Sequence, residues 1–407
     1  MSRARAVPAH SGGIAAGRIA ARYVALDAEH HLAPGEVVWD ASGRIVAVRS
    51  ARGRVEDLCL LPGLVDAHVH LQIEPLARVE RRFVPWISAV LAARREETVA
   101  RQRAAARRSI QHLIATGTTA VGEIDSTGIS RAVLERSPLG GRCYRELTGF
   151  HLDGPAAVRL VRRHEPRGTA RVAVGLSPHA PYSVSADLFR QAAAASEHLA
   201  VHCAEVPEEQ QFLRTGRGAF ATLLERMGRL PAGFRAPGVG AVRWLEQLGV
   251  LRATTQLVHC QELERGDASR IAAAGASIAV CPGTIEWFRR TPPPVPSWLA
   301  KGIPVALGTD SRASNAGFSM VAELQRACRF WPELSPAQLL AMATLHGGRA
   351  LGDRRLGSLC RSGRADFLAV PARASFQRTL EHFVQGSLCP VFAVCRGRRH
   401  AGAAPSG

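Results

Sequence analysis

Two histidines separated by one residue end an apolar run near residue 65, and this feature constrains the chain more than any other. Residues 61–70 read as a buried strand that ends in His68 and His70. Side chains at positions i and i+2 of a strand point the same way, so the two imidazoles share one face. Two converging imidazoles are half of a transition-metal site. The pair alone also fits two solvated loop histidines, so the rest of the chain has to decide.

The size of the chain allows one large domain, or one domain with a smaller satellite. It has 407 residues, of which 46% are hydrophobic, enough for a sizeable core. No run of apolar residues approaches the length needed to span a bilayer. Residues 1–13 lack the apolar core of a signal peptide, and we expect them to form a disordered tail. The sequence therefore predicts a cytoplasmic protein.

The net charge of +18 would ordinarily suggest a nucleic-acid partner. Here the arginines are dispersed from end to end, and Lys301 is the only lysine. This pattern indicates genome composition and not a phosphate-binding track, so we expect no nucleic-acid binding. The nine cysteines are odd in number and form no Cys-x-x-Cys pair, which argues against a disulfide framework and a structural zinc cage.

The distribution of strand and helix patterns predicts an α/β protein with two parts. Both chain ends contain short apolar runs separated by turn residues, which is typical of an antiparallel β unit. We expect residues 14–60 and 360–400 to form one small β-sandwich. Between them, about eight apolar strands alternate with helical stretches, one of which is a long helix over 86–115. Eight such strands close a (β/α)8 TIM barrel, predicted here over 61–359.

Metal-binding or acid–base residues recur where the proposed barrel strands end. His68 and His70 end the first strand, His202 the fifth, His259 the sixth and Asp310 the eighth. In a TIM barrel the chemistry lies at the carboxyl ends of the strands, so these side chains should meet. One strand-end histidine is weak support for a site, but this recurrence is hard to obtain by accident.

These residues also carry a family resemblance that extends over nearly the whole chain. The chain resembles the amidohydrolase superfamily, and within it the deaminases of aminopurine nucleosides and the related chlorohydrolases. A less specific likeness points to the aminodeoxyfutalosine deaminases. The motifs that carry the resemblance lie at 62–70, 83–87, 177–182, 202–205, 258–260 and 308–315.

The resemblance implies a single metal ion. Binuclear members of the superfamily bridge two metals with a carboxylated lysine on the fourth strand, whereas here that strand ends in a histidine and the only lysine lies before the eighth. We therefore expect one divalent cofactor, zinc or iron. Three neutral imidazoles and one carboxylate suit either ion and leave a position open for water. The expected ligands are His68, His70, His202 and Asp310.

The same residues predict a division of catalytic work. Asp310 would accept a proton from the attacking water, Glu205 would protonate the substrate ring and then the leaving amine, and His259 would hydrogen-bond the reacting oxygen. Glu205 also fits a solvated glutamate in a first helical turn. By resemblance His179 contacts the nucleoside, although a hydrogen-bonded loop histidine fits equally. Glu146 is expected either to line the pocket or to pack in the barrel.

The segment after the seventh strand departs from the pattern of these deaminases. Gly283 and Ile285 stand where polar residues that shape the pocket are expected. A glycine and an isoleucine would leave an apolar, roomier wall, against which an unpartnered polar group costs roughly 1–3 kcal/mol. The sequence therefore predicts better turnover of nucleosides with an apolar 5′ substituent than of those with a charged one.

The function expected from these features is metal-dependent hydrolytic deamination of an aminopurine nucleoside-like compound, with release of ammonia. Hydrolysis of a cyclic amide or a carbon–halogen bond on the same scaffold is an alternative. A non-catalytic barrel that acts as an interaction protein is another, although it would not need the four ligands together. The predicted partner is a small-molecule substrate, with no nucleic acid and no membrane. A homo-oligomer is left open.

Overall fold

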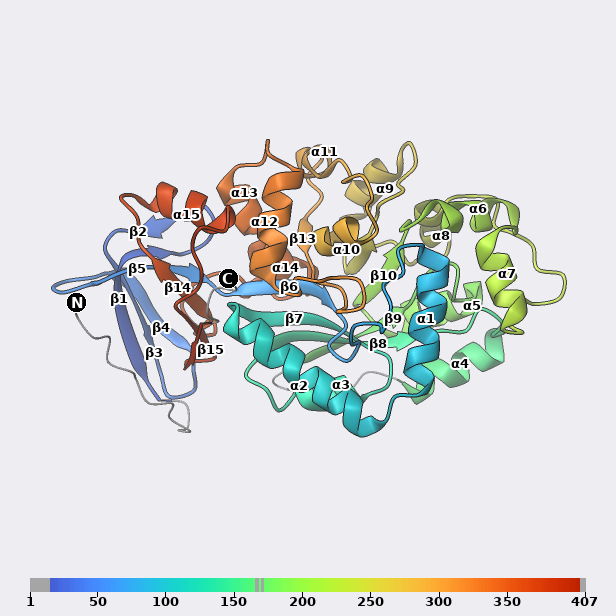
Figure 1. The fold of residues 1–407 in the computed structure, drawn as a ribbon, viewed down its shortest axis with the longest axis horizontal. Helices are drawn as coiled ribbons and strands as arrows, with labels where there is room; N and C mark the ends of the chain where they lie inside the picture. Colours follow the sequence, from blue (N-terminus) through green and yellow to red (C-terminus); the bar gives the residue numbers. More distant parts are fainter. Residues whose placement is uncertain (1–14, 165–167, 170–171, 403–407) are drawn as a thin grey trace.

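The computed structural model describes residues 15–164, 168–169 and 172–402. The tail predicted over 1–13 lies outside these ranges. Two β systems lie side by side along the long axis of the molecule (Figure 1). One is a sheet made from both ends of the chain, and the other is a parallel barrel covered by helices. The prediction of a TIM barrel with a small β unit from both chain ends is confirmed.

The terminal β unit is one hydrogen-bonded sheet in which β5 joins the two ends of the chain. β5 pairs with N-terminal β1 in parallel and with C-terminal β14 in antiparallel register. The order is β16-β15-β14-β5-β1-β3-β4, with β2 beside β1. The strands are β1 (Gly17–Ala25), β2 (His31–Leu32), β3 (Gly35–Trp39), β4 (Ile45–Ser50), β5 (Glu56–Pro62), β14 (Phe367–Pro371), β15 (Phe392–Cys395) and β16 (Arg398–Ala401).

Eight consecutive strands form the barrel, each hydrogen-bonded to the next in parallel. The ring closes through the segment after the last strand. Asp310 N–H donates to the carbonyl of His68, and His70 N–H donates to the carbonyl of Asp310, both at 3.0 Å. The barrel thus closes on predicted site residues. Its strands are β6 (Leu64–Val69), β7 (Thr118–Asp125), β8 (Gly140–Leu147), β9 (Ala173–Pro178), β10 (Leu199–Cys203), β11 (Thr255–His259), β12 (Ser277–Val280) and β13 (Val305–Leu307).

The single strand expected over 61–70 is two strands, and Gly63 separates them. β5 ends at Pro62 in the terminal sheet, and β6 begins at Leu64 in the barrel. Gly63 N–H donates to the carbonyl of Asp366 at 3.0 Å, and a Cβ at this position would lie 2.1 Å from Oγ1 of Thr119. Only glycine fits this close approach, and it stands at the point where the chain crosses from the terminal sheet into the barrel.

The helical stretch expected over 86–115 is likewise interrupted. α1 ends at Arg95, and α2 begins after Thr98, whose Oγ1 accepts a hydrogen bond from the backbone of Arg101 at 3.2 Å. This cap starts a new helix in a new direction. The helices are α1 (Phe83–Arg95), α2 (Val99–Ala115), α3 (Ile129–Leu134), α4 (Gly154–Arg163), α5 (Ala186–Ala195), α6 (Pro207–Thr215), α7 (Ala219–Arg226), α8 (Ala241–Gln247), α9 (Asp267–Ala274), α10 (Pro282–Trp287), α11 (Val295–Ala300), α12 (Met320–Phe330), α13 (Pro336–Met342), α14 (Leu345–Ala350) and α15 (Phe376–Val384).

The helices cover the outside of the barrel and bury its strands. β6, β7, β10 and β11 are buried along their whole length, as is usual for parallel strands covered by helices. Within the described ranges, none of the helices is long and apolar enough to cross a membrane. All nine cysteines are free, and six of them are buried.

Candidate active site

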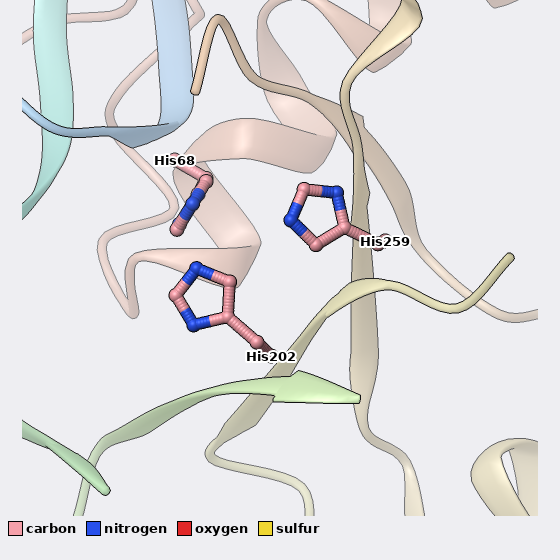
Figure 2. Close-up of side chains that lie close together, drawn as sticks. All are labelled: His68, His202 and His259. Atoms are coloured by element: carbon pink, nitrogen blue, oxygen red, sulfur yellow. The ribbon is translucent and has the colours of Figure 1, made fainter. Parts of the chain in front are cut away.

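Histidines from three barrel strands converge at the carboxyl end of the barrel. Figure 2 shows the rings of His68 on β6, His202 on β10 and His259 on β11 turned toward one another. The centroids of the His68 and His202 rings are 4.8 Å apart, and those of His68 and His70 are 5.0 Å apart. Asp310 lies next to these rings, with Oδ1 3.8 Å from Nε2 of His68 and 3.6 Å from Nε2 of His70. The structure therefore brings together all four predicted ligands and His259.

The histidines of the cluster are in the neutral form that can bind a metal ion. Burial keeps the pKa of His68 and His70 well below the usual value and lowers the pKa of His202 to about 3, so all three rings are neutral. Both ring nitrogens of His68 and Nδ1 of His70 are buried with no hydrogen-bond partner among the described residues. Buried lone pairs without partners are costly unless a ligand takes them. These residues therefore fit a divalent metal ion.

The orientation of His202 is set by the neighbouring strand. Its Nδ1 lies 3.1 Å from the carbonyl oxygen of His179, to which the Nδ1–H donates. Nε2 then carries the free lone pair, as is usual for a metal-binding histidine whose other nitrogen is held by a carbonyl.

The Asp310 carboxylate is held by two hydroxyl groups. Thr284 Oγ1 on α10 and Ser314 Oγ each donate to Oδ2 at 2.8 Å, which leaves Oδ1 facing His68 and His70. Burial raises the pKa of Asp310, and the two hydroxyls oppose that rise because they stabilise the charged form. The backbone of Asp310 is in the left-handed region, at φ 58°. Such strain in a non-glycine residue is common at functional sites.

Glu205 lies beside His259 and is buried. Its Oε2 is 3.6 Å from Nε2 of His259, and its backbone N–H donates to Oε2 of Glu209 at 2.9 Å. Burial raises the pKa of Glu205 to about 7, although the nearby Arg290 guanidinium opposes this rise. A carboxyl group with a pKa near neutrality can both accept and donate a proton at ordinary pH. The solvated first-turn glutamate considered for this position does not agree with its burial.

The two predicted substrate-binding residues both line the cavity above the histidine cluster. Nδ1 of His179 is 2.7 Å from Oγ of Ser183, whose hydroxyl donates to the carbonyl of Ala180. That hydroxyl proton is used, so Nδ1 of His179 is the donor and its Nε2 is left as an acceptor. Burial raises the pKa of Glu146, which lies on β8.

The cavity occupies about 1060 Å³, counted with its open mouth, and two helices form its apolar walls. One wall is a stripe on α1 with helical spacing, and the other is a similar stripe that begins on α7. Two arginines, Arg94 and Arg229, also line the cavity. The apolar wall residues are Phe83, Trp86, Ile87, Val90, Leu91, Phe220, Leu223, Leu224 and Met227.

The structure corrects the expected position of Gly283 and Ile285, because neither lines this cavity. Gly283 N–H donates to Oε2 of Glu323 at 2.6 Å, and a Cβ on Gly283 would lie 2.4 Å from the amide nitrogen of Asn315. The same Asn315 nitrogen donates to Oε1 of Glu323 at 2.8 Å. Gly283 and Asn315 therefore accommodate each other in the packing behind Asp310.

Sequence reasoning missed three groups of residues at the site. The helical stripes on α1 and α7 carry a detectable signal, the i, i+3, i+4, i+7 spacing of apolar residues. Ser314 lies within the motif at 308–315 and Thr284 lies in the segment after the seventh strand, but only the folded chain shows that their hydroxyls donate to Asp310. Arg290 stands in a loop with no periodic signal, and its contact with Glu205 spans 85 residues of sequence.

A closed parallel barrel with imidazoles and a carboxylate at its strand ends is the framework of a metal-dependent hydrolase. The comparison with known families agrees. The model of the amidohydrolase family matches residues 59–398. Aminodeoxyfutalosine deaminase of Deinococcus radiodurans is 32% identical over 323 residues, which cover 72% of this chain and 74% of that protein. The chain belongs to the amidohydrolase family, as the sequence motifs predicted.

Solved structures share the fold over almost the whole chain. Aminofutalosine deaminase of Helicobacter pylori, in complex with methylthio-coformycin, has a TM-score of 0.81 at 21% identity and covers 94% of this chain and 99% of its own. An adenosine deaminase of Xanthomonas campestris with bound zinc has a TM-score of 0.76 at 21% identity, with 95% and 92% covered. At this level of identity the likeness establishes the shared fold.

Proposed function

We propose that the protein is a metal-dependent deaminase that hydrolyses the exocyclic amine of an aminopurine nucleoside. The observation that carries the proposal is the position of Glu205. It lies beside His259, next to a cluster of side chains suited to a metal ion, and it lines a cavity with apolar walls. Aminodeoxyfutalosine deaminase of Deinococcus radiodurans supports the same reaction class.

The proposed metal ligands are His68, His70, His202 and Asp310. Their nitrogen and carboxylate donors suit zinc or iron, and the structural relative from Xanthomonas campestris carries zinc. When bound, such an ion lowers the pKa of water so that hydroxide is available near neutral pH. A single ion is proposed because β9 ends without a lysine and Lys301 lies on the exposed end of α11.

The chain's own residues would divide the proton transfers. Asp310 takes a proton from the attacking water through Oδ1, since Oδ2 is occupied by two hydroxyls. Glu205 gives its proton to the ring nitrogen next to the reacting carbon, takes up the remaining proton of the added hydroxyl group and delivers it to the departing amine, a task that suits a pKa near 7. After the products leave, Asp310 loses its proton to solvent and Glu205 regains one from solvent. His259 donates a hydrogen bond to the oxygen that develops charge. His179 and Glu146 hold the nucleoside from β9 and β8.

The cavity sets the expectation for the 5′ substituent of the nucleoside. Its walls on α1 and α7 are apolar, so burial of an apolar 5′ substituent (the 5′ arm) against them favours binding. Arg94 and Arg229 add two cationic groups to the same cavity, so a carboxylate on that arm finds partners. The expected penalty against charged arms rested on Gly283 and Ile285, which lie elsewhere, and it no longer applies to anionic arms.

The test is ammonia release by the metal-loaded protein from adenosine, methylthioadenosine, S-adenosylhomocysteine and aminodeoxyfutalosine under one set of conditions. We expect turnover of at least one 5′-substituted compound, with higher kcat/KM than for adenosine. Metal-loaded protein that releases no ammonia from any of the four would reject the deaminase proposal. Comparison of the neutral methylthio compound with the two carboxylate-bearing compounds then measures the contribution of the arginines.

A further inference from the structure

The guanidinium group of Arg290 lies against the back of the Glu205 carboxylate. Its Nη1 donates to Oε1 of Glu205 at 3.2 Å. The pair is withdrawn from solvent, with side-chain exposures of 14% for Arg290 and 4% for Glu205. Glu205 lines the cavity, whereas Arg290 does not. The arginine therefore contacts the proposed acid from the side opposite the substrate.

Two aromatic rings and a fixed backbone turn hold Arg290 in place. Its guanidinium carbon lies 4.5 Å from the ring centroid of Phe288 and 5.1 Å from that of Phe83. α10 ends in a turn with Arg289 in the left-handed region at φ 53°, and Arg290 N–H donates to the carbonyl of Ile285 at 3.0 Å. Contact with aromatic faces stabilises a guanidinium without offering it a competing acceptor. Glu205 therefore has a preorganised partner.

The two oxygens of Glu205 have different surroundings as a result. Oε1 is paired with Arg290, and Oε2 faces Nε2 of His259 at 3.6 Å. At the other end of the residue, the backbone N–H is held by Oε2 of Glu209 at 2.9 Å. Rotation of the carboxylate would break the arginine pair, so one oxygen is reserved for structure and the other is available for the proton.

We propose that Arg290 is a positioning residue that holds Oε1 of Glu205 and so keeps Oε2 directed at the substrate. This inference rests on the proposed deaminase function. With Oε1 paired to Arg290, Glu205 delivers both protons of one turnover through Oε2, first to the ring nitrogen and then to the amine. Arginine suits this task because it stays charged throughout and donates from a rigid, planar group.

Kinetics of three variants test the proposal. Arg290→Met keeps the apolar length of the side chain and removes its charge. We expect kcat to fall about 10- to 100-fold, with KM within about threefold of the wild type and metal content unchanged. Arg290→Lys should recover kcat to within about tenfold, because an ammonium can replace one of the donors. Arg289→Met is the control. This neighbouring residue is exposed and lies in the turn that precedes Arg290, so the variant should keep full activity.

A double-mutant cycle separates positioning from a general structural effect. If Arg290 acts through Glu205, adding Arg290→Met to Glu205→Gln should lower kcat by less than about threefold further. An equal loss in both backgrounds, or an unchanged kcat in the single variant, would overturn the proposal. Melting temperatures of the four proteins identify any variant that loses activity by unfolding.

A measurement without turnover keeps the inference separate from the proposed function. In protein labelled with carbon-13 at the glutamate carboxyl carbons, the Glu205 resonance is assigned by its loss in Glu205→Gln. It should shift in Arg290→Met and stay in place in Arg289→Met. A resonance unmoved by Arg290→Met would reject the Arg290–Glu205 pair. Absence of ammonia release with an intact shift would instead reject the deaminase assignment and leave the pair established.

Discussion

Removal of one hydroxyl from Asp310 should weaken metal binding by a measurable amount. In Ser314→Ala the carboxylate loses one of its two 2.8 Å hydrogen bonds, while the bond from Thr284 remains. A hydrogen bond to a charged group contributes about 1.5–3 kcal/mol, and about 1.4 kcal/mol corresponds to a factor of ten. The metal affinity should therefore fall about 10- to 100-fold, because Asp310 becomes both less well oriented and harder to keep ionised.

Competition with a zinc chelator of known affinity measures this change, and a melting curve checks that Ser314→Ala remains folded. Ser177→Ala is the matched control. Ser177 is also fully buried, but its hydroxyl has no hydrogen-bond partner in the described part of the chain. The control should bind zinc as the wild type does. If Ser314→Ala retains wild-type affinity within about twofold, the hydroxyls do not position Asp310 and the reasoning is wrong.

Three further predictions concern the metal, the acid and the surface charge. Elemental analysis should find about one divalent ion per chain, lost in His68→Ala or Asp310→Ala, and two tightly bound ions would contradict the proposed ligand set. Glu205→Gln should keep the metal and lose about 100-fold or more in kcat, because the amide keeps the shape but cannot shuttle a proton; unchanged turnover would remove Glu205 from the mechanism. The dispersed arginines should give only weak nucleic-acid association that salt abolishes, and tight duplex or RNA binding near physiological salt would show that the basic charge has a nucleic-acid function.

The sequence predicted the barrel strands well because buried parallel strands read as continuous apolar runs. The barrel has eight parallel strands within the described residues, the number expected from those runs. The prediction was less accurate where a single residue changes the direction of the chain. The crossing at Gly63 and the new helix after Thr98 depend on a close approach and on a cap, neither of which interrupts the apolar pattern.

The chemical identity of the centre was already present in the sequence. Histidines and an aspartate at strand ends have to meet once parallel strands close into a barrel, because all carboxyl ends then lie at one rim. What surrounds this centre was decided by tertiary structure. The partners of Glu205 and Asp310, and the cavity walls on α1 and α7, come from segments far apart in sequence. Gly283 shows the reason: its place after the seventh barrel strand predicted a cavity wall, and packing against Asn315 put it behind the site instead. Contacts between distant segments depend on how loops and helices pack, and a local pattern of residue types does not contain that information.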